Sequence, residues 1–220
     1  MKTAIMVDGG FYRRRAQCVW GDKTPKQRAA ELNDYCHKHL TSHGENNSLY
    51  RIFYYDCPPS EKVVYHPFTK KQVNLKNSDL YQWTLDFFEE LKKQRKFALR
   101  LGKLADEQAF YTLRHDVVKK LCNEKTTWDD LQESDFFLQI SQKGVDMRIG
   151  IDIASVAFKR QVDQIVLISG DSDFVPAAKL ARREGIDFIL DPLGAPIKPD
   201  LFEHIDGLRS CDKSLTTFKK

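Results

Sequence analysis

Four aspartates stand where a metal ion could be bound. Asp171 and Asp173 directly follow an apolar run at 165–168, Asp8 ends a similar run at 3–7, and Asp146 precedes apolar residues with helical spacing. Carboxylates gathered in one place repel one another, so such a cluster is stable chiefly when a cation neutralises it. Oxygen-only ligands favour a hard cation, Mg²⁺ or Mn²⁺, over zinc. The residue types therefore indicate chemistry that depends on a divalent metal ion.

The apolar runs before these acids are typical of strands buried on both faces, as in an open parallel α/β sheet. The carboxyl ends of such strands form the mouth of the sheet, where ligands bind, so the acids are expected in one cleft. Strands alternating with helices predict a parallel α/β fold. The strands are expected at 3–7, 51–55, 97–101, 136–140, 165–169 and 187–190, and the helices at 33–43, 80–95, 147–161 and 174–184.

Each acid also has a purely local explanation. Asp8 and Asp171 could be turn formers, and Asp173 and Asp146 could cap the helices that follow them. The sequence leaves this alternative open.

Two long segments fall outside the strand and helix pattern. Residues 58–77, with Pro58 and Pro59 at their start, are expected to form a long loop or insertion, and loops of that length are often functional. Residues 104–134 are expected to be helical and acidic. The sequence contains no G-x-S-x-G, P-loop or G-x-G-x-x-G motif, which argues against a serine hydrolase and a nucleotide kinase.

Composition is consistent with a cytoplasmic protein. The chain has 220 residues, of which 41% are hydrophobic, which is sufficient for a core. No apolar run approaches the roughly 20 residues of a membrane helix, and Asp8 interrupts any signal peptide, so no membrane partner is expected. The five cysteines lack metal-site or disulfide spacing. Reduced thiols and a cytoplasmic location are therefore expected.

The charge distribution suggests contact with a phosphate backbone. The net charge is only +4, but residues 1–28 hold seven Lys and Arg against two acids, including Arg13, Arg14 and Arg15 close to Asp8. A second basic stretch lies at 62–103. Phosphate backbones favour such patches through counterion release, although a basic run is often only a solvated face.

Three motifs resemble the NYN domain, a branch of the PIN-like metal-dependent nucleases that includes LabA-like bacterial proteins. They lie at 5–11, at 142–147 continuing to Asp152, and at 169–176, and the closing segment 191–206 is similar as well. One departure is that Phe11 and Tyr12 stand where many family members carry Asn. The resemblance implies a PIN-like three-layer α/β fold with a central, mostly parallel sheet flanked by helices. It predicts a single domain at 1–210 with a helical and loop insertion at about 57–135, and a C-terminal tail at 211–220.

The resemblance also implies a metal-dependent endoribonuclease that hydrolyses RNA phosphodiester bonds. By this resemblance Asp8, Asp146, Asp171 and Asp173 are catalytic residues and ligands of Mg²⁺ or Mn²⁺, and Asp152 is a further candidate ligand, although six helical positions turn it away from Asp146. The candidate substrate-binding residues are Lys143, Arg13, Arg14 and Ser169. The implied partners are single-stranded or structured RNA, with tRNA as one candidate, and a second copy of the chain.

Two other interpretations stay open. The first is a catalytically silent RNA-binding or regulatory module on the same fold. The second, a phosphomonoesterase of another α/β family, would need an acid two residues after a nucleophilic Asp8, where Gly10 stands.

Overall fold

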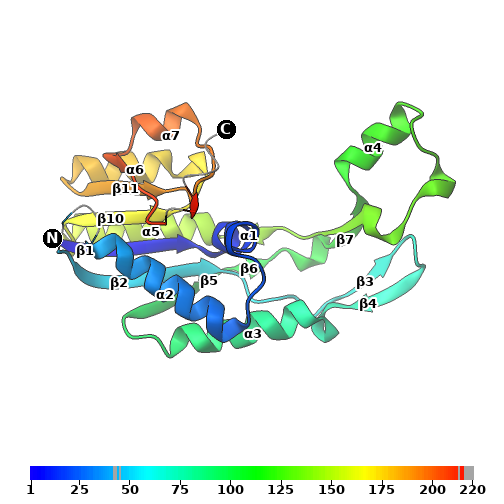
Figure 1. The fold of residues 1–220 in the computed structure, drawn as a ribbon, viewed down its shortest axis with the longest axis horizontal. Helices are drawn as coiled ribbons and strands as arrows, with labels where there is room; N and C mark the ends of the chain where they lie inside the picture. Colours follow the sequence, from blue (N-terminus) through cyan, green and yellow to red (C-terminus); the bar gives the residue numbers. More distant parts are fainter. Residues whose placement is uncertain (42–43, 45, 213, 216–220) are drawn as a thin grey trace.

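The centre of the computed structural model, which describes residues 1–41, 44, 46–212 and 214–215, is a six-stranded sheet. All of its neighbouring strands pair in parallel (Figure 1). The strands, in their order across the sheet, are β12 (Gly207–Leu208), β11 (Asp187–Asp191), β10 (Gln164–Ile168), β1 (Lys2–Asp8), β2 (Ser48–Asp56) and β5 (Phe97–Leu101).

Helices cover both faces of this sheet and create two apolar cores. Because side chains alternate along a strand, Ala4 and Met6 of β1 pack on one side and Ile5 and Val7 on the other. This arrangement confirms the predicted PIN-like three-layer fold. No described helix has the length and apolar character needed to cross a membrane. The first core contains residues of α5 (Val145–Phe158), α6 (Val175–Arg183) and α7 (Pro199–Glu203), and the second contains residues of α1 (Gly9–Trp20), α2 (Pro25–Thr41) and α3 (Asp79–Lys92).

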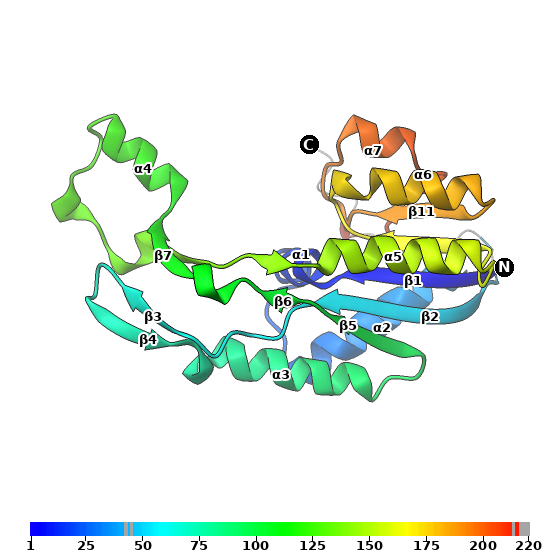
Figure 2. The same ribbon diagram turned by 180° about the vertical axis from the view of Figure 1, so that it is seen from behind.

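Two segments leave the central unit and project together beyond the carboxyl ends of its strands (Figures 1 and 2). We call residues 58–76 and 103–143 the arm. The first segment is a hairpin rather than the predicted loop, and the second contains strands with one short helix rather than a mainly helical stretch. The elements of the arm are β3 (Val63–His66), β4 (Lys71–Asn74), β6 (Lys103–Leu104), β7 (Phe110–Leu113), α4 (His115–Cys122), β8 (Phe136–Gln139) and β9 (Gln142–Lys143), with 3₁₀ turns at Leu75–Asn77, Asp106–Gln108, Trp128–Asp130 and Glu133–Asp135.

Non-local contacts explain why the arm is not helical. β8 pairs antiparallel with β7, far from the central sheet that the sequence pattern suggested for it. A small aromatic cluster joins these strands to the hairpin: His66 stacks on Tyr111 at a ring-centroid distance of 4.3 Å, and Phe136 contacts both His66 and Phe68. α3 and β5, which lie between the two arm segments in the chain, belong to the central unit.

A buried carboxylate fastens the described part of the C-terminal segment to the fold. Asp191, at the end of β11, accepts hydrogen bonds from the hydroxyls of Tyr35 and Ser210 and from the backbone N–H of Leu193. Its Oδ2 lies 2.9 Å from Nε2 of His39, which is fully buried on α2. Residues 213 and 216–220 of the predicted tail lie outside the described residues.

The His39–Asp191 contact makes stability depend on pH. Burial alone would lower the pKa of His39, but hydrogen bonds to Asp191 and Cys211 and their negative charges raise it to about 9. A pKa raised in the folded state contributes stability that is complete below the ordinary value near 6.5 and is lost as the pH rises through about 9. We expect the free energy of unfolding, measured with urea, to fall by about 2–3 kcal/mol between pH 6.5 and 9.5 from this group.

The matched variants are His39→Gln and His37→Gln, since His37 is an exposed residue on the same helix. His39→Gln should flatten the dependence on pH, whereas His37→Gln should leave it unchanged. An unchanged slope in His39→Gln would contradict the assignment.

Candidate active site

The chain adds strands to the sheet first on one side of β1 and then on the other, so the topological switch point lies between β1 and β10. From β1 the chain builds outwards through β2 to β5, and it then returns to the other side of β1 with β10 and continues to β11. Ligands of open α/β sheets bind at such a switch point, outside the carboxyl ends of the strands. Asp8 ends β1, and Ser169 follows β10 directly, so both residues stand at this point.

Asp8 is held in place from two sides. Its Oδ1 accepts the backbone N–H of Phe11 at 3.0 Å, which caps α1, and its Oδ2 accepts the hydroxyl of Ser169 at 3.1 Å. Burial raises the pKa of Asp8, the two hydrogen bonds lower it, and the negative charges of Asp146 and Asp56 raise it further. Asp8 therefore accepts a local backbone hydrogen bond, as a turn former would, and it is also one of several acids that influence one another's pKa.

The loop after β10 presents Asp171 and Asp173. Oδ1 of Asp171 accepts the backbone N–H of Asp173 at 3.1 Å, and the N–H of Asp171 donates to Ser169. The side chain of Asp173 makes no hydrogen bond with another described residue and does not cap α6. Gly170 is required here, because a Cβ atom would lie 2.8 Å from the ring of Phe11. Both acids are exposed, so they are accessible to a ligand.

Asp146 lies in the first turn of α5. The N-cap position belongs to Gly144, whose φ of 77° is in the left-handed region, so capping does not explain this acid. Burial raises the pKa of Asp146, and the charges of Asp171 and Asp173 raise it further. Asp8, Asp146, Asp171 and Asp173 therefore come from three separate segments and act electrostatically on one another at the switch point.

Asp152 does not join this group. It lies further along α5, where its Oδ2 accepts the hydroxyl of Tyr55 at 2.9 Å and pairs with Nε of Arg100 at 3.0 Å. Its contacts fasten α5 to β2 and β5.

Asp56 is an acid that the sequence analysis missed. It ends β2 beside β1 and is fully buried. It accepts hydrogen bonds from Arg13 Nη2 at 3.0 Å, Tyr54 Oη at 3.0 Å and Gln142 Nε2 at 3.1 Å. An apolar run ending in an acid was the signal used for Asp8, and 52–56 show it too. The hydrogen bond from Gln142 therefore links the arm to Asp56 at the end of β2.

The predicted substrate-binding residues are placed differently. Arg13 turns inwards to Asp56 and is only 24% exposed, whereas Arg14 is exposed and makes no ion pair with another described residue. Lys143 is exposed on β9, three residues before Asp146. Ser169 is buried and orients Asp8. Arg14 and Lys143 are therefore the two of these residues that are accessible to a ligand.

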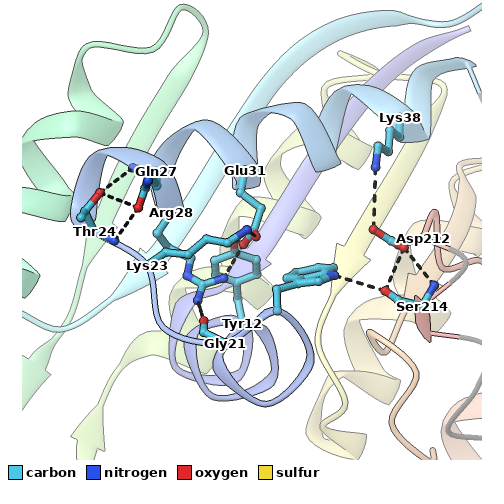
Figure 3. Close-up of polar contacts among 11 residues, drawn as sticks. Tyr12, Gly21, Lys23, Thr24, Gln27, Arg28, Glu31, Lys38, Asp212 and Ser214 are labelled. Carbon is cyan, nitrogen blue, oxygen red and sulfur yellow. Dashed lines mark hydrogen bonds and ion pairs between the residues drawn. The ribbon is translucent and has the colours of Figure 1, made fainter.

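A cleft of about 820 Å³ opens beside the acids, between α1 and α3. Its walls carry Arg13, Arg14, Lys23 and Arg28 together with Leu80 and Trp83. Figure 3 shows how part of this wall is fixed: Glu31 pairs with both Lys23 and Arg28 and accepts the hydroxyl of Tyr12. Gly10 and Gln142 line the end of the cleft nearest the acids.

As the side chains stand, no group of three or more His, Cys, Asp or Glu residues within the described ranges is close enough to hold a metal ion. The donor chemistry nevertheless fits a hard divalent cation, because the gathered groups are all carboxylates. Burial is the main cause of the raised pKa values of Asp8 and Asp146, and repulsion by neighbouring acids adds to both shifts. A bound cation relieves such repulsion.

The three-layer fold with acids at its switch point is of the PIN-like, nuclease type. The chain belongs to the NYN domain family, since the NYN domain model matches residues 83–196, more than half of its length. The matched segment contains Asp146, Asp171 and Asp173 but not Asp8. A crystal structure of a protein of unknown function from Vibrio parahaemolyticus is similar at 14% identity and a TM-score of 0.48, covering 97% of this chain and 94% of that one. No curated protein matches the chain.

Proposed function

We propose that this protein is a metal-dependent ribonuclease that hydrolyses phosphodiester bonds of RNA. The observation that supports the proposal is the electrostatic coupling of Asp146 to Asp8 on one side and to Asp171 and Asp173 on the other, near the switch point of a NYN domain. Backbone and hydroxyl donors alone do not account for them, because Asp146 and Asp173 have no hydrogen-bonding partner among the described residues.

These four residues would hold Mg²⁺ or Mn²⁺. When bound, such an ion neutralises charge on a phosphate and activates a water molecule. The protein's own groups orient the acids. Ser169 donates a hydrogen bond to the Asp8 carboxylate, and beside it Arg13 and Gln142 donate hydrogen bonds to Asp56. Arg14 and Lys143 supply exposed positive charge for the phosphates of the substrate.

The arm favours a polymeric substrate. At its base, Lys143 of β9 packs closely against Gly102 just after the end of β5, where a Cβ atom on Gly102 would lie 2.8 Å from the carbonyl oxygen of Lys143. The arm then extends away beyond the carboxyl ends of the strands (Figure 2). An RNA chain that passes the acids can therefore continue along the arm, which a mononucleotide cannot do.

The test is cleavage of mixed single-stranded RNA and tRNA in Mn²⁺, with EDTA as the metal control. Asp171→Asn keeps an oxygen that can accept the N–H of Asp173 but removes the charge, and Asp34→Asn, at an exposed acid on α2, is its matched control. Cleavage that needs both metal and Asp171, and that survives in Asp34→Asn, would support the proposal. RNA binding without cleavage in any divalent ion would refute it in favour of a silent RNA-binding module.

A further inference from the structure

The cleft between α1 and α3 approaches Asp8 at Gly10, which lines its end. A Cβ atom on Gly10 would lie 3.6 Å from Oδ1 of Asp8 and 3.2 Å from Oε1 of Gln142. Gly10, which has no side chain, therefore lies between Asp8 and the cleft. When a phosphate group is bound at the acids, the part of the ligand that is attached to it therefore has space in the cleft.

One wall of the cleft is apolar and aromatic. Leu80 is 66% exposed in the first turn of α3, so its side chain is accessible to a ligand. Trp83 lies one turn further along the same helix, and its ring is fixed by stacking on Phe87 at 5.0 Å and by donating its N–H to the carbonyl oxygen of Lys23 at 2.9 Å. A fixed indole beside exposed leucine suits the flat face of a nucleobase.

The opposite wall carries positive charge. Arg13, Lys23 and Arg28 are held by Asp56 and Glu31, so they cannot swing towards a ligand. Arg14 is exposed on the same face of the cleft and lacks such a partner in the described part of the chain. Two exposed acids, Asp22 and Asp79, also line the cleft. Since Asp56 and Glu31 already pair with the other three cations, Arg14 is the lining cation that stays available to a ligand. An exposed arginine in the same cleft as Leu80 and Trp83 matches a nucleotide, which has a phosphate at one end and a base at the other.

Size and shape further restrict the ligand. About 820 Å³ lies within the range of pockets that enclose small ligands, so the cleft can hold a nucleotide unit. A base in a duplex is stacked on both faces and paired at its edge, and it cannot reach Leu80 and Trp83 without leaving the helix.

We infer that this cleft is a binding subsite for one unpaired nucleotide of RNA, next to the phosphate held at the acids, with its base against Leu80 and Trp83 and its phosphate at Arg14. The inference rests on the proposed function for the position of the scissile phosphate. It makes the protein selective for single-stranded segments.

The experiment measures binding of fluorescein-labelled octaribonucleotides in EDTA, where no cleavage occurs. A single abasic ribose is moved along the oligonucleotide, and the free protein's affinity is recorded by fluorescence anisotropy. We expect removal of the base at one position to weaken binding about 5- to 100-fold, because one stacked base contributes roughly 1–3 kcal/mol. Leu80→Ser should reduce this penalty, and Phe158→Ser, at a similarly exposed apolar residue at the far end of α5, should not.

Arg14→Gln should weaken binding of all the oligonucleotides alike. It should also reduce the slope of log affinity against log salt concentration by about 1, as the loss of one phosphate contact does. Equal affinity for all abasic positions, equal affinity for duplex and single strand, or no binding of single-stranded RNA would each overturn the inference. Because these measurements need no metal, the subsite can fail while cleavage is observed, and it can be found in a protein that does not cleave.

Discussion

Replacing Asp8 by Asn should abolish cleavage while making the metal-free protein more stable. Asn keeps an oxygen that can accept the N–H of Phe11, and its amide can donate to the hydroxyl oxygen of Ser169, so the local geometry survives. The charge that we propose binds the metal is lost, and we expect the rate of RNA cleavage to fall at least about 100-fold.

The gain in stability follows from the raised pKa of Asp8. A carboxylate whose pKa is higher in the folded protein than in the unfolded chain opposes folding when it is charged. The free energy of unfolding, measured with urea in EDTA at pH 7.5, should therefore be higher for Asp8→Asn than for the wild type. The difference should shrink as the pH falls through the raised pKa, because the wild-type carboxyl then becomes neutral too.

A metal-free Asp8→Asn protein that is less stable than the wild type at every pH would show that Asp8 is chiefly a structural cap. Addition of Mn²⁺ separates the two roles further. The ion should raise the melting temperature of the wild type and have little effect on the variant.

The adjacent arginines Arg13 and Arg14 should respond very differently to replacement by alanine. Arg13→Ala removes the partner of the fully buried Asp56, and loss of one member of a buried ion pair costs about 3–5 kcal/mol. We expect the lower end of this range, about 3 kcal/mol in urea unfolding, because Tyr54 and Gln142 still donate to Asp56. Arg14→Ala should change stability by no more than about 0.5 kcal/mol.

A double variant identifies the cause of the Arg13 effect. Asp56→Asn removes the buried negative charge, so adding it to Arg13→Ala should recover part of the lost stability. If the double variant is no more stable than Arg13→Ala, then lost packing rather than an unpaired charge explains the effect. The two variants should have the opposite effects on RNA binding. Arg14→Ala should reduce the affinity of the folded protein for RNA, whereas Arg13→Ala should reduce RNA binding only by lowering the amount of folded protein.

The sequence was informative where local pattern and tertiary structure agree. Continuous apolar runs are buried on both faces, and this predicted β1, β10 and β11 to within about two residues. α1 was missed because Gly9 and Gly10 after Asp8 are typical of a flexible turn. In the structure Gly9 begins the helix, where a Cβ atom would lie 2.6 Å from the ring of Tyr54. That requirement comes from a neighbouring strand, which a local pattern cannot reveal.

The same distinction applies to the site. Acids that follow apolar runs were predicted because parallel strands bring their carboxyl ends to one edge. The separation of Arg13 from Arg14 was not predictable from a run of three arginines, since it depends on which of them faces the buried Asp56. The arm was assigned wrongly because its strands are held by pairing between β7 and β8 and by the aromatic cluster around His66, both of which join residues distant in the chain.

The central position of β1 has a consequence for synthesis on the ribosome. Its two neighbours emerge at very different times, because Thr3 pairs with Leu49 on one side and with Gln164, 161 positions later, on the other. Until β10 has been made, β1 has an open edge, and pairing between strands so distant in the chain slows folding. Asp8 is made early, whereas Asp171 and Asp173 are made 163 and 165 residues later. A site that needs Asp8 together with Asp171 and Asp173 is therefore incomplete on every nascent chain in which Asp173 has not yet been made.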